Sequence, residues 1–254
     1  MNARSRRAWA CSLVVAAATA LPAQTEPGKP VPPAASAPAP APVPAAPAQV
    51  ERATALLRAH AARCLGKQVV LADYVQRRTT ALGKEPLVSK GEFLFVRDPG
   101  VVVFFAKEPR LSTVRLAATT YEVYRPQKQQ LERYFLDGPE LAQGLFAVIG
   151  GDAERLLRDF VVVACSDVPG DGGQVLVRLV ANAARVRERL PEIAITLRGK
   201  DAELAVVAYT DHAGDRVAIE LQALRLDPPT RPSEVLVVPK GTTVVEHRVA
   251  ASSK

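Results

Sequence analysis

Between Val88 and Leu136 apolar and polar residues alternate, and turn residues interrupt the alternation. The expected turns are Asp98-Pro99-Gly100, Glu108-Pro109 and Arg125-Pro126. Period-two alternation broken by Pro and Gly predicts consecutive antiparallel strands. We expect one face of this sheet to collect Leu94, Val96, Val102 and Phe104. Because this face is so apolar, it needs helices, a partner or a hydrophobic ligand to cover it.

The region before this stretch predicts one helix and one strand. Apolar residues recur at spacings of three and four over residues 49–65, which is typical of an amphipathic helix. They are Val50, Ala53, Leu57, Ala61 and Cys64. Gly66 is a stop signal, a strand pattern begins at Val70, and a loop at 81–86 leads into the alternating stretch.

After Leu136 the pattern predicts two short helices and then strands. The first helix covers 140–149, and the second follows Asp152, a good N-cap residue. The expected strands are Phe160–Ser166, Gln174–Ala181, Glu192–Leu197, Glu203–Tyr209, Arg216–Leu226, Val235–Val238 and Thr243–Arg248. This order predicts an α+β domain with one curved antiparallel sheet and helices on its concave side.

The N-terminal 48 residues predict export rather than a folded domain. Residues 1–23 combine a basic start with a short apolar run from Ala8 to Ala20, which is typical of a cleaved signal peptide. An uncleaved anchor is the alternative. Cys11 lies inside the apolar run, so we do not expect a lipoprotein. Residues 24–48 are rich in Pro and Ala and predict a disordered linker, either a spacer or a mere tail.

Composition narrows the class of protein further. The chain has 254 residues, of which 48% are apolar, enough for one substantial core over residues 49–254. The formal net charge is +7, but Arg4, Arg6 and Arg7 supply three of those charges. The rest of the chain lacks a Lys/Arg run and aromatic-basic interleaving, so we do not expect nucleic-acid binding.

Catalytic and metal-binding patterns are weak. The histidines are His60, His212 and His247, and only His60 has a partner at ligand spacing, Cys64, with no third or fourth ligand at fixed spacing. Ser89 and Ser112 have no base that the sequence places beside them. Phosphate loops and nucleophile elbows are also missing from the sequence. We therefore expect no enzyme, no metal and no cofactor.

Two cysteines remain after removal of the signal peptide, Cys64 and Cys165. In an oxidising compartment they are able to pair and tie the first helix to a later strand. Two buried thiols are the alternative, because free cysteine is often buried. The sequence leaves both open.

Four segments in order resemble the periplasmic outer-membrane lipoprotein carriers, the LolA family. They are LeuAlaAspTyrValGln at 71–76, SerLysGlyGluPheLeuPheValArgAspPro at 89–99, the spacing from Pro109 to Pro126 with ThrTyrGluValTyrArgPro, and ValLeuValValProLysGlyThrThrValVal at 235–245. The resemblance covers residues 50–249. It implies an unclosed β-barrel whose helices form a lid over an apolar cavity for acyl chains.

Carried over residue by residue, the resemblance implies an acyl-chain site and a lid latch. The expected cavity residues are Tyr74, Leu94, Val96, Val102, Phe104, Val114 and Leu116. Arg97 matches the family arginine that bonds the lid. Two departures stand out: Asp98 is inserted after this arginine, where it either shifts its aim or pairs with it, and Ala117-Ala118 replaces the usual turn.

The resulting function hypothesis is a monomeric periplasmic carrier that moves lipoprotein acyl chains, or another lipid, from the inner to the outer membrane. The resemblance implies two partners, an inner-membrane lipoprotein-releasing transporter and an outer-membrane acceptor. The alternative is a LolA-like binding module that senses lipid or lipoprotein without ferrying it. Fold alone does not choose between the two.

Overall fold

The alternating pattern along the chain folds into strands that pair into one curved sheet. A computed structural model describes residues 42–80, 85–136, 140–170, 172–210, 214–229 and 238–247. Within these ranges the strands are β1 (Val69–Thr79), β2 (Leu87–Val96), β3 (Val101–Glu108), β4 (Ser112–Ala117), β5 (Thr120–Arg125), β6 (Gln130–Phe135), β7 (Phe160–Asp167), β8 (Gln174–Ala181), β9 (Glu192–Arg198), β10 (Glu203–Thr210), β11 (Arg216–Leu226) and β12 (Thr243–His247).

The helices of the described ranges are α1 (Pro47–Cys64), α2 (Glu140–Gly150), α3 (Ala153–Asp159) and α4 (Ala184–Arg189), with a 3-10 turn, η1, at Pro126–Lys128. The signal peptide, residues 24–41 of the predicted linker, most of the loop at 81–86, His212 and most of the strand expected at 235–238 lie outside the described residues, while α1 already begins within the predicted linker, at Pro47.

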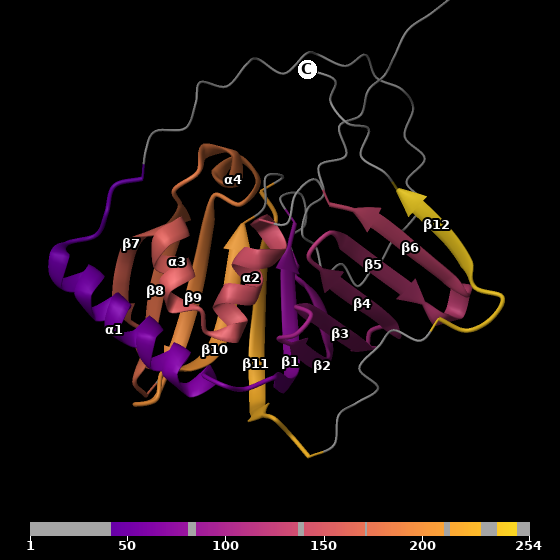
Figure 1. The fold of residues 1–254 in the computed structure, drawn as a ribbon, viewed down its shortest axis with the longest axis horizontal. Coiled ribbons are helices and arrows are strands. Elements are labelled where there is room, and N and C mark those ends of the chain that lie inside the picture. The colour runs from indigo at the N-terminus through magenta and orange to yellow at the C-terminus, as the bar shows by residue number, and fades with distance from the viewer. Residues whose placement is uncertain are drawn as a thin grey trace, which may run out of the picture.

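The strand order in the described sheet is β12-β6-β5-β4-β3-β2-β1-β11-β10-β9-β8-β7. Neighbouring strands are antiparallel, except that β12 runs parallel to β6. The sheet ends at β12 on one edge and at β7 on the other, so it is curved but unclosed (Figure 1). The predicted α+β class with a curved, unclosed sheet is confirmed.

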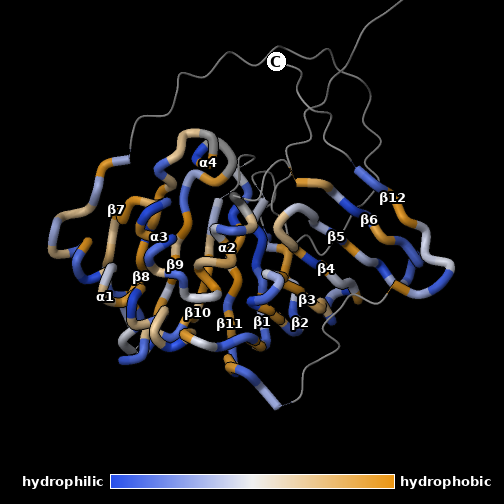
Figure 2. The backbone as a smooth tube through the Cα atoms, in the orientation of Figure 1, coloured by the Kyte–Doolittle hydropathy of each residue, from blue (hydrophilic) through white to orange (hydrophobic). Residues whose placement is uncertain are grey.

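Helices α1, α2 and α3 lie on one side of the sheet and cover one half of it, whereas α4 lies at one end of β8 and β9. Figure 1 shows α1, α2 and α3 in front of the half formed by β7 to β11, while β4, β5, β6 and β12 extend beyond them. Figure 2 shows hydrophobic and hydrophilic positions alternating along the strands, as expected for a sheet whose two faces differ. The side that carries the helices is called the helix-facing side here, and the opposite side the outer side.

Local sequence explains how the helices begin and end. Pro47 occupies the first position of α1, where its missing N–H costs nothing. Ala53, Leu57, His60 and Cys64 are the buried residues of α1, so its buried face includes a histidine as well as the expected apolar residues. The side chain of Asp152 accepts a hydrogen bond of 3.1 Å from the Arg155 amide and caps α3, as predicted.

The face expected for Leu94 and Val96 is wrong. Leu94 pairs with Val103, whereas Phe104 pairs with Phe93. Because side chains alternate across a strand, Leu94 and Val96 point to the outer side, opposite to Val102 and Phe104. There Leu94 packs in an outer cluster that is separate from the main core, formed by Val69, Leu71, Leu94, Val101 and Val103, with Val96, Phe105 and Ala117 packed against it. These two residues therefore do not line a space under the helices.

Candidate functional site

The helix-facing side of β1 to β4 is lined by large buried apolar side chains. Tyr74, Val102, Phe104, Val114 and Leu116 belong to the main core together with residues of α1, α2 and α3. At the centre, the Phe104 ring meets the Tyr74 ring at a centroid distance of 5.2 Å and the Phe93 ring at 5.1 Å, both edge to face. The structure thus brings together these five of the residues expected to line an acyl-chain site.

Helix α2 packs against β2 at one side of this core. The ring of Phe146 lies 6.0 Å from the ring of Phe95, measured between centroids. A Cβ atom built on Gly150 would lie 3.1 Å from the same Phe95 ring, so the end of α2 packs tightly against β2. The covering layer is therefore seated on the sheet mainly through apolar contacts.

Arg97, at the end of β2, bonds the ends of two helices. Its Nε donates to the carbonyl oxygen of Lys67 at 2.8 Å, and its Nη2 donates to those of Cys64 at 3.1 Å and Gly150 at 2.7 Å. Cys64 and Gly150 are the last residues of α1 and α2, where helix carbonyls lack partners and the helix dipole favours a cation. The hydrogen bonds found for this side chain among the described residues go to backbone carbonyls, not to the exposed Asp98.

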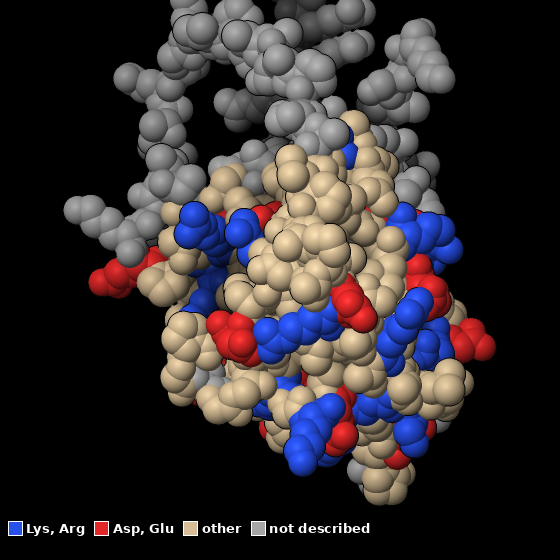
Figure 3. Space-filling model, turned by 90° about the vertical axis from the view of Figure 1, so that its left-hand side faces the viewer, with Lys and Arg blue, Asp and Glu red and all other residues tan. Residues whose placement is uncertain are grey.

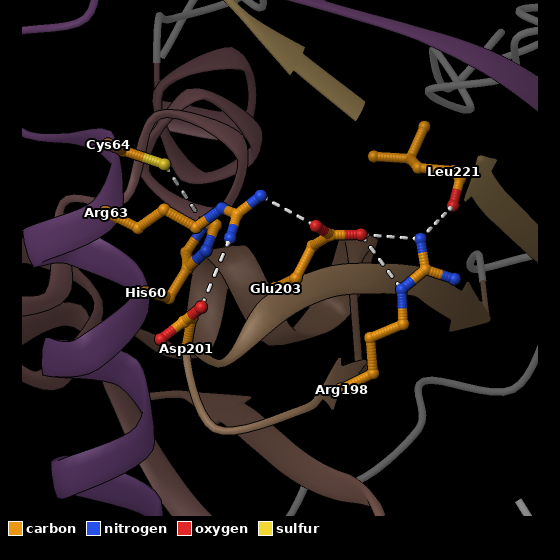
Figure 4. A network of polar contacts seen from close by, with 7 residues as sticks. All are labelled: His60, Arg63, Cys64, Arg198, Asp201, Glu203 and Leu221. Atoms are coloured by element: carbon orange, nitrogen blue, oxygen red, sulfur yellow. Dashed lines mark hydrogen bonds and ion pairs between the residues drawn. The ribbon is translucent and has the colours of Figure 1, made fainter. Parts of the chain in front are cut away.

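A second set of polar contacts fastens α1 to the sheet. Arg63 donates to Glu203 at 2.7 Å, and Glu203 also accepts from Nε of Arg198 at 2.9 Å. Figure 4 shows Glu203 between the two guanidinium groups, with Arg198 also donating to the Leu221 carbonyl. At the other end of α1, Arg52 pairs with Asp167 of β7 on the surface.

The ion pairs on the solvent-exposed surface of α1 are weak. Figure 3 shows basic and acidic side chains lying next to one another on the face formed by α1 and β7. The exposed pair Arg58–Glu154, which joins α1 to α3 at 3.0 Å, is of this kind. Exposed pairs contribute little to stability, so the apolar contacts, the Arg63 network and Arg97 hold the helices in place.

His60 and Cys64 lie buried between α1 and α2. Nε2 of His60 lies 3.1 Å from the Val148 carbonyl oxygen, so the neutral ring carries its proton there and donates it. Burial lowers the pKa of His60 and raises the pKa of the Cys64 thiol. Cys64 and Cys165 are both buried free thiols, which is the alternative to a disulfide. Among the described residues, His, Cys, Asp and Glu do not gather into groups of three or more that could hold a metal.

A band of buried polar residues at one end of the helix-facing core was missed by the sequence reasoning. Gln76 and Ser89 face each other on β1 and β2, and Ser112 lies in the same region on β4. The sequence signal was present, because these polar residues occupy inward positions of strands that are otherwise apolar inside.

The uncovered end of the sheet carries a different cluster. On β6 and β12 the rings of Tyr134 and His247 stack with centroids 4.4 Å apart. Glu132 accepts hydrogen bonds from Tyr134 at 2.8 Å and from Arg125 at 2.5 Å. Burial acts to raise the pKa of Glu132, but these hydrogen bonds outweigh it and the pKa is lowered. His247 thus packs on a tyrosine in an edge strand, which the sequence reasoning did not foresee.

Comparisons with known proteins give structural matches but no sequence match. No protein-family model matches the chain, and no curated protein matches it in sequence. No helix in the described ranges is long and apolar enough to cross a membrane.

Three solved structures illustrate the matches. An uncharacterised conserved protein from Thermus thermophilus aligns at 10% identity and a TM-score of 0.45, covering 77% of this chain and 99% of its own. A LolA superfamily protein from Nitrosomonas europaea aligns at 10% identity and 0.36, covering 71% and 94%. The Mycobacterium tuberculosis lipoprotein LppX aligns at 12% identity and 0.37, covering 70% and 97%.

Identities and scores this low leave the chemistry of the site to the chain's own residues. The architecture described above, an unclosed and largely antiparallel curved sheet with helices packed on one side, is the one that the sequence resemblance implied.

Proposed function

We propose that the protein carries acyl chains between membranes, holding them between the sheet and a lid formed by α1, α2 and α3. The observation that carries the proposal is the construction of the core: one apolar sheet face continues from the strands around Phe104 to the half covered by α1, α2 and α3, and one arginine holds the last residues of α1 and α2. An acyl chain needs a large apolar surface and little polar chemistry, and each buried CH2 contributes about 0.8 kcal/mol. The side chains around Phe104 offer such a surface.

Release of the cargo requires a lid that moves at modest cost. The exposed ion pairs of α1 are weak, and the apolar contact of Phe146 with Phe95 is of the kind that an acyl chain can replace. The Arg97 bonds to Cys64 and Gly150 then act as the latch of the empty, closed state. In this proposal the loaded state lacks these hydrogen bonds, and burial of the acyl chain compensates for their loss.

The cargo is the acyl part of a lipoprotein or another lipid, and the place of action is the periplasm, which the protein reaches through its N-terminal signal peptide. The resemblance to lipoprotein carriers supports an inner-membrane releasing transporter and an outer-membrane acceptor as partners. Both are proposals that follow from the carrier function.

Neighbouring residues of β3 provide a matched test. Phe104 faces the helices, whereas Phe105 packs in the outer cluster. Phe104→Asp should abolish binding of a fluorescent fatty-acid probe, because a carboxylate facing lipid tails is costly to desolvate, while Phe105→Asp should leave binding intact.

A second pair of substitutions, which introduces no charge, keeps the test valid if a buried carboxylate unfolds the protein. Val102 and Val103 are both fully buried, on the helix-facing and the outer side respectively. Each Val→Thr change adds one buried hydroxyl at nearly constant volume, so the two variants should lose similar stability. Only Val102→Thr should weaken the binding of the probe. If the wild type and both variants bind the probe equally well, the acyl chain does not lie against the helix-facing side of β3.

A further inference from the structure

In and next to the buried polar band of the helix-facing core, two hydroxyl groups have no hydrogen-bond partner among the described residues. The Tyr74 hydroxyl and Ser112 Oγ are both buried without a hydrogen-bond partner among the described residues. Tyr74 is 1% exposed and Ser112 is 7% exposed. Buried polar groups are nearly always hydrogen-bonded, and leaving one unpaired costs free energy. Two such groups on one face therefore point to a ligand that completes them.

The strand register places the two hydroxyl groups in one row. Tyr74 pairs with Gly91, Gly91 with Ala106, and Ala106 with Ser112, so the row crosses β1, β2, β3 and β4. The residues between Tyr74 and Ser112 are the two smallest ones. The Tyr74 ring starts on β1 and contacts Phe104 of β3, so the side chain leans from β1 toward β3, that is, toward the strands on the Ser112 side. The two hydroxyl-bearing residues thus share one row on the helix-facing side, with only Gly91 and Ala106 between them.

The surroundings of this row change in polarity along β1. Toward the start of the strand lies the apolar core, with Ala72 on the same side as Tyr74. Toward its end lie Gln76 and then Arg78, whose guanidinium donates to Asp215. The neutral hydroxyl groups therefore stand between an apolar region and an ion pair that is already formed.

An apolar region followed by neutral hydroxyl groups suits an acyl chain whose apolar tail ends in an ester or amide carbonyl. Building on the proposed carrier function, we propose that the hydroxyl groups of Tyr74 and Ser112 donate hydrogen bonds to the carbonyl of an ester- or amide-linked acyl chain whose tail lies along Phe104. Burial raises the pKa of Tyr74, so its phenol stays protonated and able to donate at neutral pH. A free fatty acid fits less well, because its carboxylate would lose water among neutral hydroxyl groups, and the Arg78 guanidinium is already paired with Asp215.

The test compares probes that differ only in the end of the chain. Pyrene-labelled acyl probes of equal length end in a methyl ester, an N-methyl amide, a carboxylate or a plain methyl group. The dissociation constant of each probe is measured with the full-length protein. Tyr74→Phe and Ser112→Ala should each raise the Kd of an ester or amide probe about two- to tenfold, and should leave the plain hydrocarbon probe within about twofold. Whether the ester or the amide loses more identifies the linkage. Tyr124→Phe, the same change at a tyrosine outside the main core, should raise none of them.

A stability measurement separates binding from a structural role. The empty Tyr74→Phe variant should melt at the same temperature as the wild type or higher, because the removed hydroxyl has no hydrogen bond to lose among the described residues. A lower melting temperature, an unchanged Kd for both carbonyl probes, or an equal loss for the hydrocarbon probe would each overturn the inference. If the wild type binds the hydrocarbon probe and only the ester and amide contrast is missing, the carrier proposal survives; if it binds no probe, both fall.

Discussion

Replacing Arg97 with leucine should lower the free energy of unfolding of the empty protein and slow the release of cargo. The substitution leaves the carbonyls of Lys67, Cys64 and Gly150 without their donor. Hydrogen bonds to a charged group contribute roughly 1.5–3 kcal/mol each, but these share one partly exposed guanidinium and water can replace some of them. A loss of about 3 kcal/mol in the free energy of unfolding is therefore the expected scale. For a domain of this size, it corresponds to a fall of about 6–12 °C in melting temperature.

The effect on transfer follows from which state holds the bonds. In the proposed mechanism they exist when the lid is closed on an empty core and are broken when cargo lifts it. Arg97→Leu then destabilises the empty state and not the loaded one, so cargo stays bound longer. The assay follows a labelled acylated protein from loaded carrier to acceptor membranes, beside urea unfolding of the empty protein.

Two control variants sharpen this experiment. Arg97→Lys keeps the charge but loses the planar fork, and should fall between wild type and Arg97→Leu in both measurements. Asp98→Ala removes an exposed side chain and should stay within about 0.5 kcal/mol of the wild type. An unchanged melting temperature in Arg97→Leu would mean that the bonds contribute nothing, and a lower melting temperature with unchanged transfer would separate them from release.

Three further variants test the account of the fold. Because burial lowers the pKa of His60, the folded state holds its proton less tightly than the unfolded chain; stability should be complete above about pH 6.5 and fall below it. In urea titrations from pH 5 to 8, His60→Gln should flatten that slope, and an unchanged slope would assign it to other groups. Gly91→Ala should cost about 3 kcal/mol, because the new Cβ would lie 1.9 Å from the backbone oxygen of Phe105; a melting temperature equal to that of wild type would refute this contact. Asp152→Ala should lose about 1 kcal/mol by removing the cap of α3, and no loss in urea unfolding would show that the cap does not contribute.

Periodicity predicted the elements well where each strand has one apolar and one polar face. The strands Gln174–Ala181 and Arg216–Leu226 have the bounds that the sequence predicts, and α1 starts two residues and ends one residue earlier than predicted. The cap at Asp152 was also predictable, because capping depends on local sequence. Helix α4 was missed: it has six residues and a largely charged sequence, so it lacks the apolar face that marks a helix.

The two faces of β2 and β3 could not be told apart from sequence. Both strands are apolar at nearly every central position, from Phe93 to Val96 and from Val101 to Phe105, because one side forms the main core and the other the outer cluster. Period two then assigns no face, and only the pairing of Phe93 with Phe104 settles it.

Features that depend on distant partners were also out of reach. The sequence singled out Arg97 through the family resemblance, but Lys67, Cys64 and Gly150 as its acceptors depend on where α1 and α2 end in space. The parallel pairing of β12 with β6 joins segments more than one hundred residues apart, and no local pattern encodes it. The polar row of Tyr74 and Ser112 likewise exists only once four strands are in register.

Native mass spectrometry of the protein, purified without added lipid from the cells that make it, tests the carrier proposal most directly. The carrier account predicts a population heavier than the chain by the mass of a lipid or an acylated protein. This added mass should be lost on delipidation and be much reduced in Phe104→Asp, but not in Phe105→Asp. A wild-type chain that carries no lipid, whether alone or with a stable protein partner, would contradict the account.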